Sequence, residues 1–175
     1  PSLADEINLL PEVERATGIG LLTVKIEDRG QYLTTINPAT AEGVFDLGLT
    51  SGTYADLTAD TIFVSQQYAD NNDSKLGDTI AITLADAQVK TLSIAGIYEF
   101  DEIAGKYTVS RDIIKDSTVI NFDLGVYIKT KAGVSEESAR AVLQAAVDKY
   151  GQGTLLSKRE YIDSQSGQIN QLLGL

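Results

Sequence analysis

The strongest constraint on the fold is a strand pattern followed at once by a helix pattern in the last third of the chain. Apolar residues fill every second position over residues 120–128, which predicts a strand with one buried face. Ser135 is then placed to cap a helix over residues 136–150. Its apolar residues recur at helical spacing: Ala139, Val142, Leu143, Ala146, Val147 and Tyr150. A further strand is predicted at residues 154–156, so the segment forms a βαβ unit and the fold class is α+β.

The first third of the chain predicts a short helix and a hairpin. Ser2 followed by Asp5 is typical of a helix-opening cap. Apolar residues alternate with polar ones over residues 20–26, and residues 32–36 are predicted to return as the partner strand. The turn between them is expected to use a positive φ at Gly30.

The middle of the chain predicts a strand, a capped helix and a second hairpin. Residues 61–64 are rich in β-forming side chains, and the Ser65 hydroxyl is placed to cap a short helix. Alternation over residues 79–84 and a return over 89–97 predict the hairpin, with Asp86 in its turn.

The composition excludes most familiar enzyme chemistry. The 175 residues contain no His and no Cys, so catalytic triads with an imidazole, thiol nucleophiles, thiolate metal sites and disulfides are all ruled out. Fourteen Lys and Arg against 25 Asp and Glu give a net charge of −11, which argues against a nucleic-acid partner. A chain of this length and with 43% hydrophobic residues is expected to form one domain, which has room for two lobes.

Four short acidic or polar motifs could suggest a site. Alternating carboxylates and amides over residues 70–74 suit calcium, but an EF-hand glycine and a late Glu are missing, and a solvated loop is the favoured interpretation. Gly77 and Asp78 are interpreted as a turn that starts a strand. Catalysis is not assigned to the carboxylates of Glu99, Asp101 and Glu102, because their separation and burial cannot be read from sequence. It is not assigned to Ser157 and Lys158 either, because neighbouring residues on a strand point to opposite faces. We therefore assign no catalytic, cofactor-binding or metal-binding residue and predict that the chain is not an enzyme.

Several motifs in the middle of the chain resemble the FtsX-like ABC transporter permeases. The motifs occur in the family's order: a strand followed by a Ser-capped helix, then a strand that begins with Gly-Asp, then a strand with an internal Gly. Gly52 resembles the glycine that precedes this block in the family. The motif residues are 62–69 (IFVSQQYA), 75–80 (KLGDTI) and 94–98 (IAGIY).

The resemblance covers residues 45–100 by motif and implies a MacB-like periplasmic core domain. In that family, a βαβ lobe is built from both chain ends and a smaller, mostly β lobe is inserted. Here this implies a single domain over residues 1–175, with the first lobe at about 1–36 and 118–160 and the inserted lobe at about 37–117. Residues 161–175, which include the segment SQSGQINQLL, resemble the helical approach to a transmembrane helix. With no Met at position 1 and no signal peptide, we expect a piece of a longer polypeptide.

The resemblance implies a transport role on the extracytoplasmic side of a bacterial cell membrane. A separate cytoplasmic ABC ATPase subunit would hydrolyse ATP, and a second permease copy would complete the transporter. The domain would handle a substrate or transmit motion to an extracytoplasmic partner. Two alternatives remain: a stand-alone secreted binding or adhesion module, and, more weakly, a hydrolase that uses carboxylates alone.

Overall fold

A computed structural model describes residues 2–150, 153–157 and 159–161. The helices are α1 (Leu3–Asn8), α2 (Pro38–Ala41), α3 (Gln66–Asn72), α4 (Asp101–Ala104) and α5 (Glu136–Tyr150), with short 3-10 turns η1 (Tyr54–Asp56) and η2 (Arg111–Ile114). The strands are β1 (Val13–Ile26), β2 (Arg29–Ile36), β3 (Leu49–Ser51), β4 (Thr61–Ser65), β5 (Thr79–Thr83), β6 (Val89–Tyr98), β7 (Tyr107–Ser110) and β8 (Phe122–Thr130). The α+β class is confirmed.

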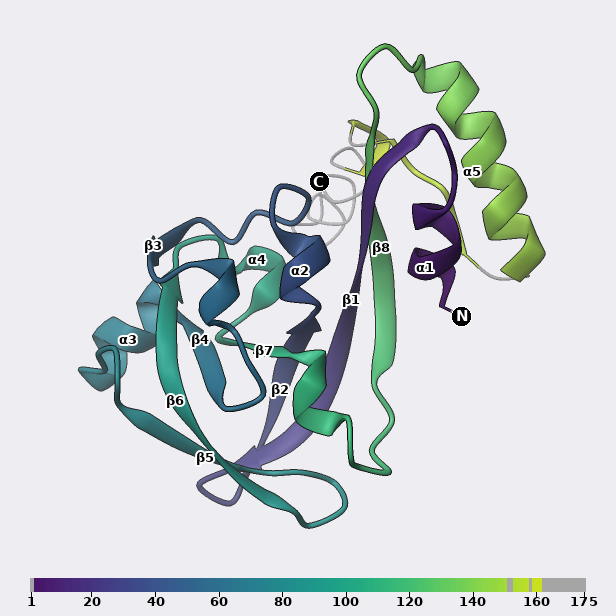
Figure 1. The fold of residues 1–175 in the computed structure, drawn as a ribbon. Coiled ribbons are helices and arrows are strands. Elements are labelled where there is room, and N and C mark those ends of the chain that lie inside the picture. The colour runs from purple at the N-terminus through teal and green to yellow at the C-terminus, as the bar shows by residue number, and fades with distance from the viewer. Residues whose placement is uncertain (1, 151–152, 158, 162–175) are drawn as a thin grey trace, which may run out of the picture.

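Six of the strands close into a ring. The order is β2-β7-β4-β6-β5-β1, and β1 also pairs with β2, so the sheet returns to its starting strand. β3 adds to the side of β6, and β8 pairs with the first half of β1 (Figure 1). The weakest link in the ring is between β1 and β5, which share the single pair Lys25↔Thr83.

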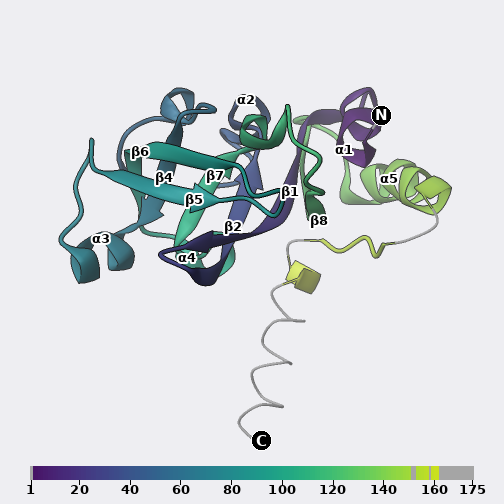
Figure 2. The same ribbon diagram turned by 90° about the horizontal axis from the view of Figure 1, so that it is seen from below.

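β1 is long enough to serve both halves of the molecule. Its residues Val13 to Leu21 pair with β8, and its residues Gly20 to Ile26 pair with β2. Figure 2 shows the ring on one side of β1, with β8, α1 and α5 on the other. The sequence predicted only the second half of this strand, because the polar and glycine residues over 14–20 hide the alternation.

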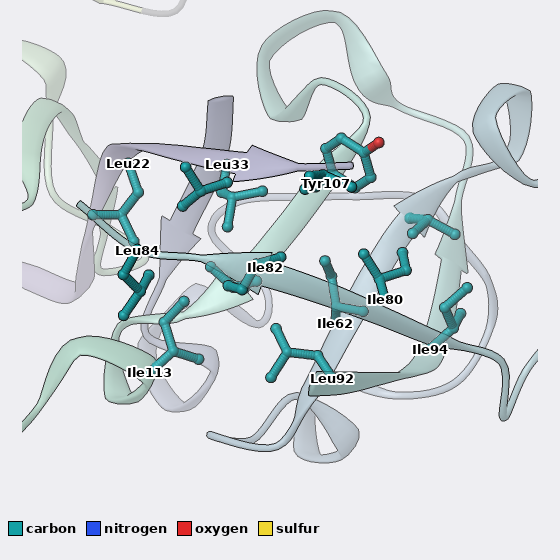
Figure 3. Packing of buried hydrophobic residues seen from close by; sticks show 14 of the residues in the cluster. Leu22, Leu33, Ile62, Ile80, Ile82, Leu84, Leu92, Ile94, Tyr107 and Ile113 are labelled. Atoms are coloured by element: carbon teal, nitrogen blue, oxygen red, sulfur yellow. The ribbon is translucent and has the colours of Figure 1, made fainter. Parts of the chain in front are cut away.

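Three clusters of apolar side chains form the core. The first fills the interior of the ring (Figure 3) and includes Leu22, Leu33, Ile62, Ile82, Leu92 and Val109. The second lies under α2 and α4 and contains Phe45, Phe63 and Tyr98 among others. The third joins α1 and α5 to β1 and β8 through side chains such as Ile7, Val13, Ala139 and Leu143. β1 contributes to all three clusters.

Several predicted local structures are confirmed. Ser2 and Asp5 form a capping box at the start of α1. The Ser65 hydroxyl accepts a hydrogen bond from the Tyr68 backbone N–H at 3.1 Å, and Asp86 lies in the turn between β5 and β6. The Ser138 backbone N–H donates to the Ser135 hydroxyl at 3.1 Å, at the start of α5.

Three expectations about the strands are wrong. The positive φ in the first hairpin belongs to Glu27 and Asp28, which form a two-residue turn, and Gly30 already lies in β2. Residues 154–156 form no strand, so β8 and α5 have no third member of a βαβ unit among the described residues. Leu124 is 58% exposed, because a bulge opposite Ile19 and Gly20 breaks the alternation in β8.

The proposed division into lobes remains a prediction. In the structure, β2 pairs with β7, and β1 pairs with β5 at Lys25 and Thr83. None of the described helices is long and apolar enough to cross a bilayer.

Candidate binding cavity

A cavity of about 670 Å³ opens where β5 separates from β1. Its walls come from the end of β1, the start of β2, α3, the start of β5 and the start of β7. The lining residues are Ile26, Glu27, Arg29, Gln31, Gln67, Tyr68, Asn71, Asn72, Thr79, Ile80, Ala81, Lys106 and Tyr107. Small-molecule sites are commonly of this size, and they combine an apolar lining with a few polar groups.

The floor of the cavity is the end of the apolar ring interior. Ile26, Ile80 and Tyr107 are each less than 10% exposed and belong to the first core cluster. The ring of Tyr107 meets that of Tyr68 edge-on, with ring centroids 5.0 Å apart and an interplanar angle of 60°. Ile80 and Tyr107 appear in the close view of this core (Figure 3).

The Tyr107 phenol stays neutral under physiological conditions. Burial raises the pKa of Tyr107 above its ordinary value, and the neighbouring Tyr68 and Glu27 raise this pKa further. The hydroxyl therefore keeps its proton and remains able to donate a hydrogen bond.

Helix α3 is held firmly at the mouth of the ring. Its first turn is capped by Ser65, whose backbone N–H also donates to the carbonyl of Lys106 at 3.0 Å. At its other end, the Asn72 side chain donates to the carbonyl of Tyr68 at 2.9 Å. The cap and the bond to Lys106 therefore tie the start of α3 to the ring next to the cavity.

Three carboxamides and three charged side chains stand at the rim of the cavity. The side chains of Gln31, Gln67 and Asn71 form no hydrogen bond with another described residue. Glu27, Arg29 and Lys106 form no ion pair with one either. The cavity therefore offers donors, acceptors and a net positive balance in a chain of net charge −11.

The polar run over residues 70–74 was interpreted as a solvated loop, but most of it belongs to a helix and its end. Asp70, Asn71 and Asn72 belong to α3, and Asp73 ends it with a φ of 50°. No group of three acidic side chains able to hold a metal ion occurs among the described residues. Asn71 and Asn72 line the cavity, a role the sequence did not suggest.

The turn predicted at Gly77 and Asp78 is confirmed. Gly77 has a φ of 92°, and the Asp78 carboxylate accepts a hydrogen bond from the Lys75 backbone N–H at 3.0 Å. Both residues lie directly before β5, as the sequence predicted.

The remaining acidic and polar candidates do not meet in the cavity. Asp101 and Glu102 occupy the first turn of α4, and Glu99 and Glu102 are exposed. The Ser157 hydroxyl accepts a hydrogen bond from the Glu160 backbone N–H at 3.1 Å, while Lys158 lies outside the described residues. The cavity itself was missed, because its lining comes from four separate stretches of the sequence and only the folded chain brings them together.

The fold matches known structures, whereas sequence comparison gives no family. No family model matches this chain, and no curated protein does. The periplasmic region of MacB from Actinobacillus actinomycetemcomitans superposes with a TM-score of 0.60 at 12% identity, over 86% of this chain and 73% of that one.

Two further structures match equally broadly. A domain of a protein described as a permease from Porphyromonas gingivalis gives a TM-score of 0.55 at 21% identity, over 83% of this chain and 75% of that one. The extracellular domain of the noncanonic ABC-type transporter YknZ from Gram-positive bacteria gives 0.56 at 15% identity, over 86% and 83%. This chain therefore has the fold of the extracytoplasmic domains of MacB-like ABC transporter permeases.

Proposed function

We propose that the chain is the non-catalytic extracytoplasmic domain of an ABC transporter permease. The observation that carries the proposal is the fold itself, because it superposes with TM-scores of 0.55–0.60 on the periplasmic region of MacB, a domain of a permease and the extracellular domain of YknZ. Fold alone does not determine activity, so the role must be tested on the parent protein.

In this role, the lobe of α1, β8 and α5 faces the membrane and the ring lies farther out. α1 packs against α5 in the third core cluster, and Glu6 of α1 lies 3.8 Å from Lys149 near the end of α5. Helices α1 and α5 therefore lie side by side in this lobe (Figure 2), and Leu155, which follows α5, packs against the same core cluster. Transmembrane segments of the parent protein would continue from this lobe.

The long strand β1 gives the domain a way to transmit motion. It runs without interruption from the membrane-facing lobe into the ring, and its side chains belong to all three core clusters. A separate cytoplasmic ATPase would drive movement of the transmembrane part, which pairs with a second permease copy. This movement would carry the ring along as a rigid extension. An extracytoplasmic partner or substrate would respond to that movement.

The topology can be tested by labelling single cysteines in the full-length parent protein. This chain has no native cysteine, so Thr91→Cys on β6 and Ala132→Cys before α5 each give one exposed thiol in this domain. Both thiols should react with a membrane-impermeant maleimide in intact cells, with other cysteines of the parent removed. Labelling only after lysis would contradict the proposal, and release of the whole protein into the medium would favour a secreted binding module.

The separate ATPase can be tested by co-purification. The full-length permease should purify with a nucleotide-binding subunit, and ATP hydrolysis by the complex should disappear when the phosphate-binding lysine of that subunit is replaced. ATP hydrolysis by the permease chain alone would overturn the assignment of catalysis to the other subunit.

A further inference from the structure

We propose that the cavity between β1 and β5 binds an extended peptide segment that carries carboxylate side chains, and that the segment pairs with the free edge of β5. This inference goes beyond the transport role and does not depend on it. It rests on an unpaired strand edge, an adjacent cavity and the charges at the rim.

The strand edge is the first observation. β5 pairs with β6 along its whole length, from Thr79↔Ser93 to Thr83↔Val89. On its other side β5 meets β1 only at Lys25↔Thr83. No described strand pairs with that side over residues 79–82, although exposed backbone edges of this kind readily accept another strand.

The cavity supplies room for the incoming strand. Thr79, Ile80 and Ala81 of β5 line it directly, and Ile26 and Glu27 line the opposite side of the gap. β1 ends at Ile26 because the chain turns at Glu27 and Asp28, and the neighbour that β5 would otherwise have is lost there. An added strand about 4.8 Å from β5 would occupy this gap.

The rim favours a peptide with carboxylates. Arg29, at the start of β2, and Lys106, just before β7, both line the cavity. Glu27 is the one acidic residue among the lining residues. Side chains of an added strand alternate in direction, so every second side chain would point toward Arg29 and Lys106. Gln31, Gln67 and Asn71 offer donors and acceptors to the peptide backbone.

Binding can be measured by fluorescence polarisation of a labelled heptapeptide against the 175-residue chain. The probe alternates Val and Glu residues. The first control replaces each Glu by Gln, and the second carries N-methyl groups on alternate backbone amides, which blocks strand pairing. We expect the Glu peptide to bind, the Gln peptide to bind at least about tenfold more weakly, and the N-methylated peptide not to bind.

Matched protein variants locate the site. Arg29→Gln combined with Lys106→Gln should weaken binding of the Glu peptide at least about tenfold. Lys115→Gln combined with Lys131→Gln makes the same change in net charge on exposed side chains outside the cavity, and it should leave binding within about twofold. Hydrogen exchange at the backbone amides of residues 79–82 should slow when the peptide is bound.

Three outcomes would overturn the proposal. The first is that the Glu peptide does not bind. The second is that the N-methylated peptide binds as tightly, because strand pairing would then play no part. The third is that an oligogalacturonate trimer binds the cavity in place of the peptide, which would make it a saccharide site.

Discussion

At the residue scale, Gly52 shows why one position in the resemblance is a glycine. Its φ is 83°, and a Cβ atom there would stand 2.3 Å from the carbonyl oxygen of Ala95 on β6. Any side chain would therefore meet both backbone strain and a clash with a strand that is itself paired on both sides. The resemblance marked this residue, but the close approach to β6 is visible only in the fold.

Replacing Gly52 should therefore lower the free energy of unfolding more than replacing a glycine that has a positive φ but no close neighbour. Gly43→Ala is the matched control, because Gly43 has a φ of 80° with open space around its would-be Cβ atom. We expect Gly43→Ala to lower the free energy of unfolding by about 1 kcal/mol and Gly52→Ala by more than about 2 kcal/mol, measured by urea unfolding. Equal losses would show that the backbone at Ala95 yields easily.

At the scale of elements, β8 illustrates a pattern that predicts a strand correctly and its buried face only in part. Val126 and Ile128 pack against the third core cluster, as their spacing predicted. Leu124 belongs to the same alternating set but is exposed, because Ile19 and Gly20 face Gly125 and Asp123 and leave one extra residue in β8. A bulge depends on the partner strand, so the alternation in one strand cannot reveal it.

The bulge predicts unequal costs for two truncations in β8. Ile128→Ala should lower the free energy of unfolding by about 1–2 kcal/mol, less than for a fully buried side chain because Ile128 is only partly buried. Leu124→Ala should change it by no more than about 0.5 kcal/mol. Urea unfolding followed by far-UV circular dichroism tests both, and an equal loss at the two positions would mean that the alternation is not broken in solution.

At the scale of the whole molecule, tyrosines set a limit on stability at alkaline pH. Burial is the main cause that raises the pKa values of Tyr54, Tyr98, Tyr107 and Tyr127. Tyr98 is fully buried, and its hydroxyl donates to the Gly105 carbonyl at 2.7 Å and accepts from Thr108 at 3.2 Å. The folded state holds these protons more tightly than the unfolded chain, so their stabilisation is complete below the unfolded pKa of about 10 and is lost as the pH rises toward the folded values.

Tyr98→Phe should reduce the dependence of stability on alkaline pH. Above pH 10, the fall in the free energy of unfolding should be shallower than in the parent chain by about 1.4 kcal/mol per pH unit. At neutral pH the variant should lose about 1–3 kcal/mol, because Gly105 and Thr108 lose a buried partner. Tyr32→Phe is the control, since Tyr32 is 67% exposed, and an identical slope in the two variants would contradict the assignment to Tyr98.

The sequence by itself determined the α+β class, most strands, the two hairpins and the caps at Ser2, Ser65 and Ser135. These features depend on residues close together in the chain, since alternation, helical spacing and side-chain capping act over a few positions. It also excluded imidazole and thiol chemistry, because the side chains are absent.

Only the tertiary structure decided the closure of the ring, the double role of β1, the bulge in β8 and the cavity at β5. Each depends on pairing between segments far apart in the chain. β2 pairs with β7, β1 pairs with β8, and β5 pairs with β1 through the single pair of Lys25 and Thr83. Strand pairing is set by the packing of whole faces, which no local pattern contains. The cavity lining from Ile26 to Tyr107 therefore exists only once the ring has closed.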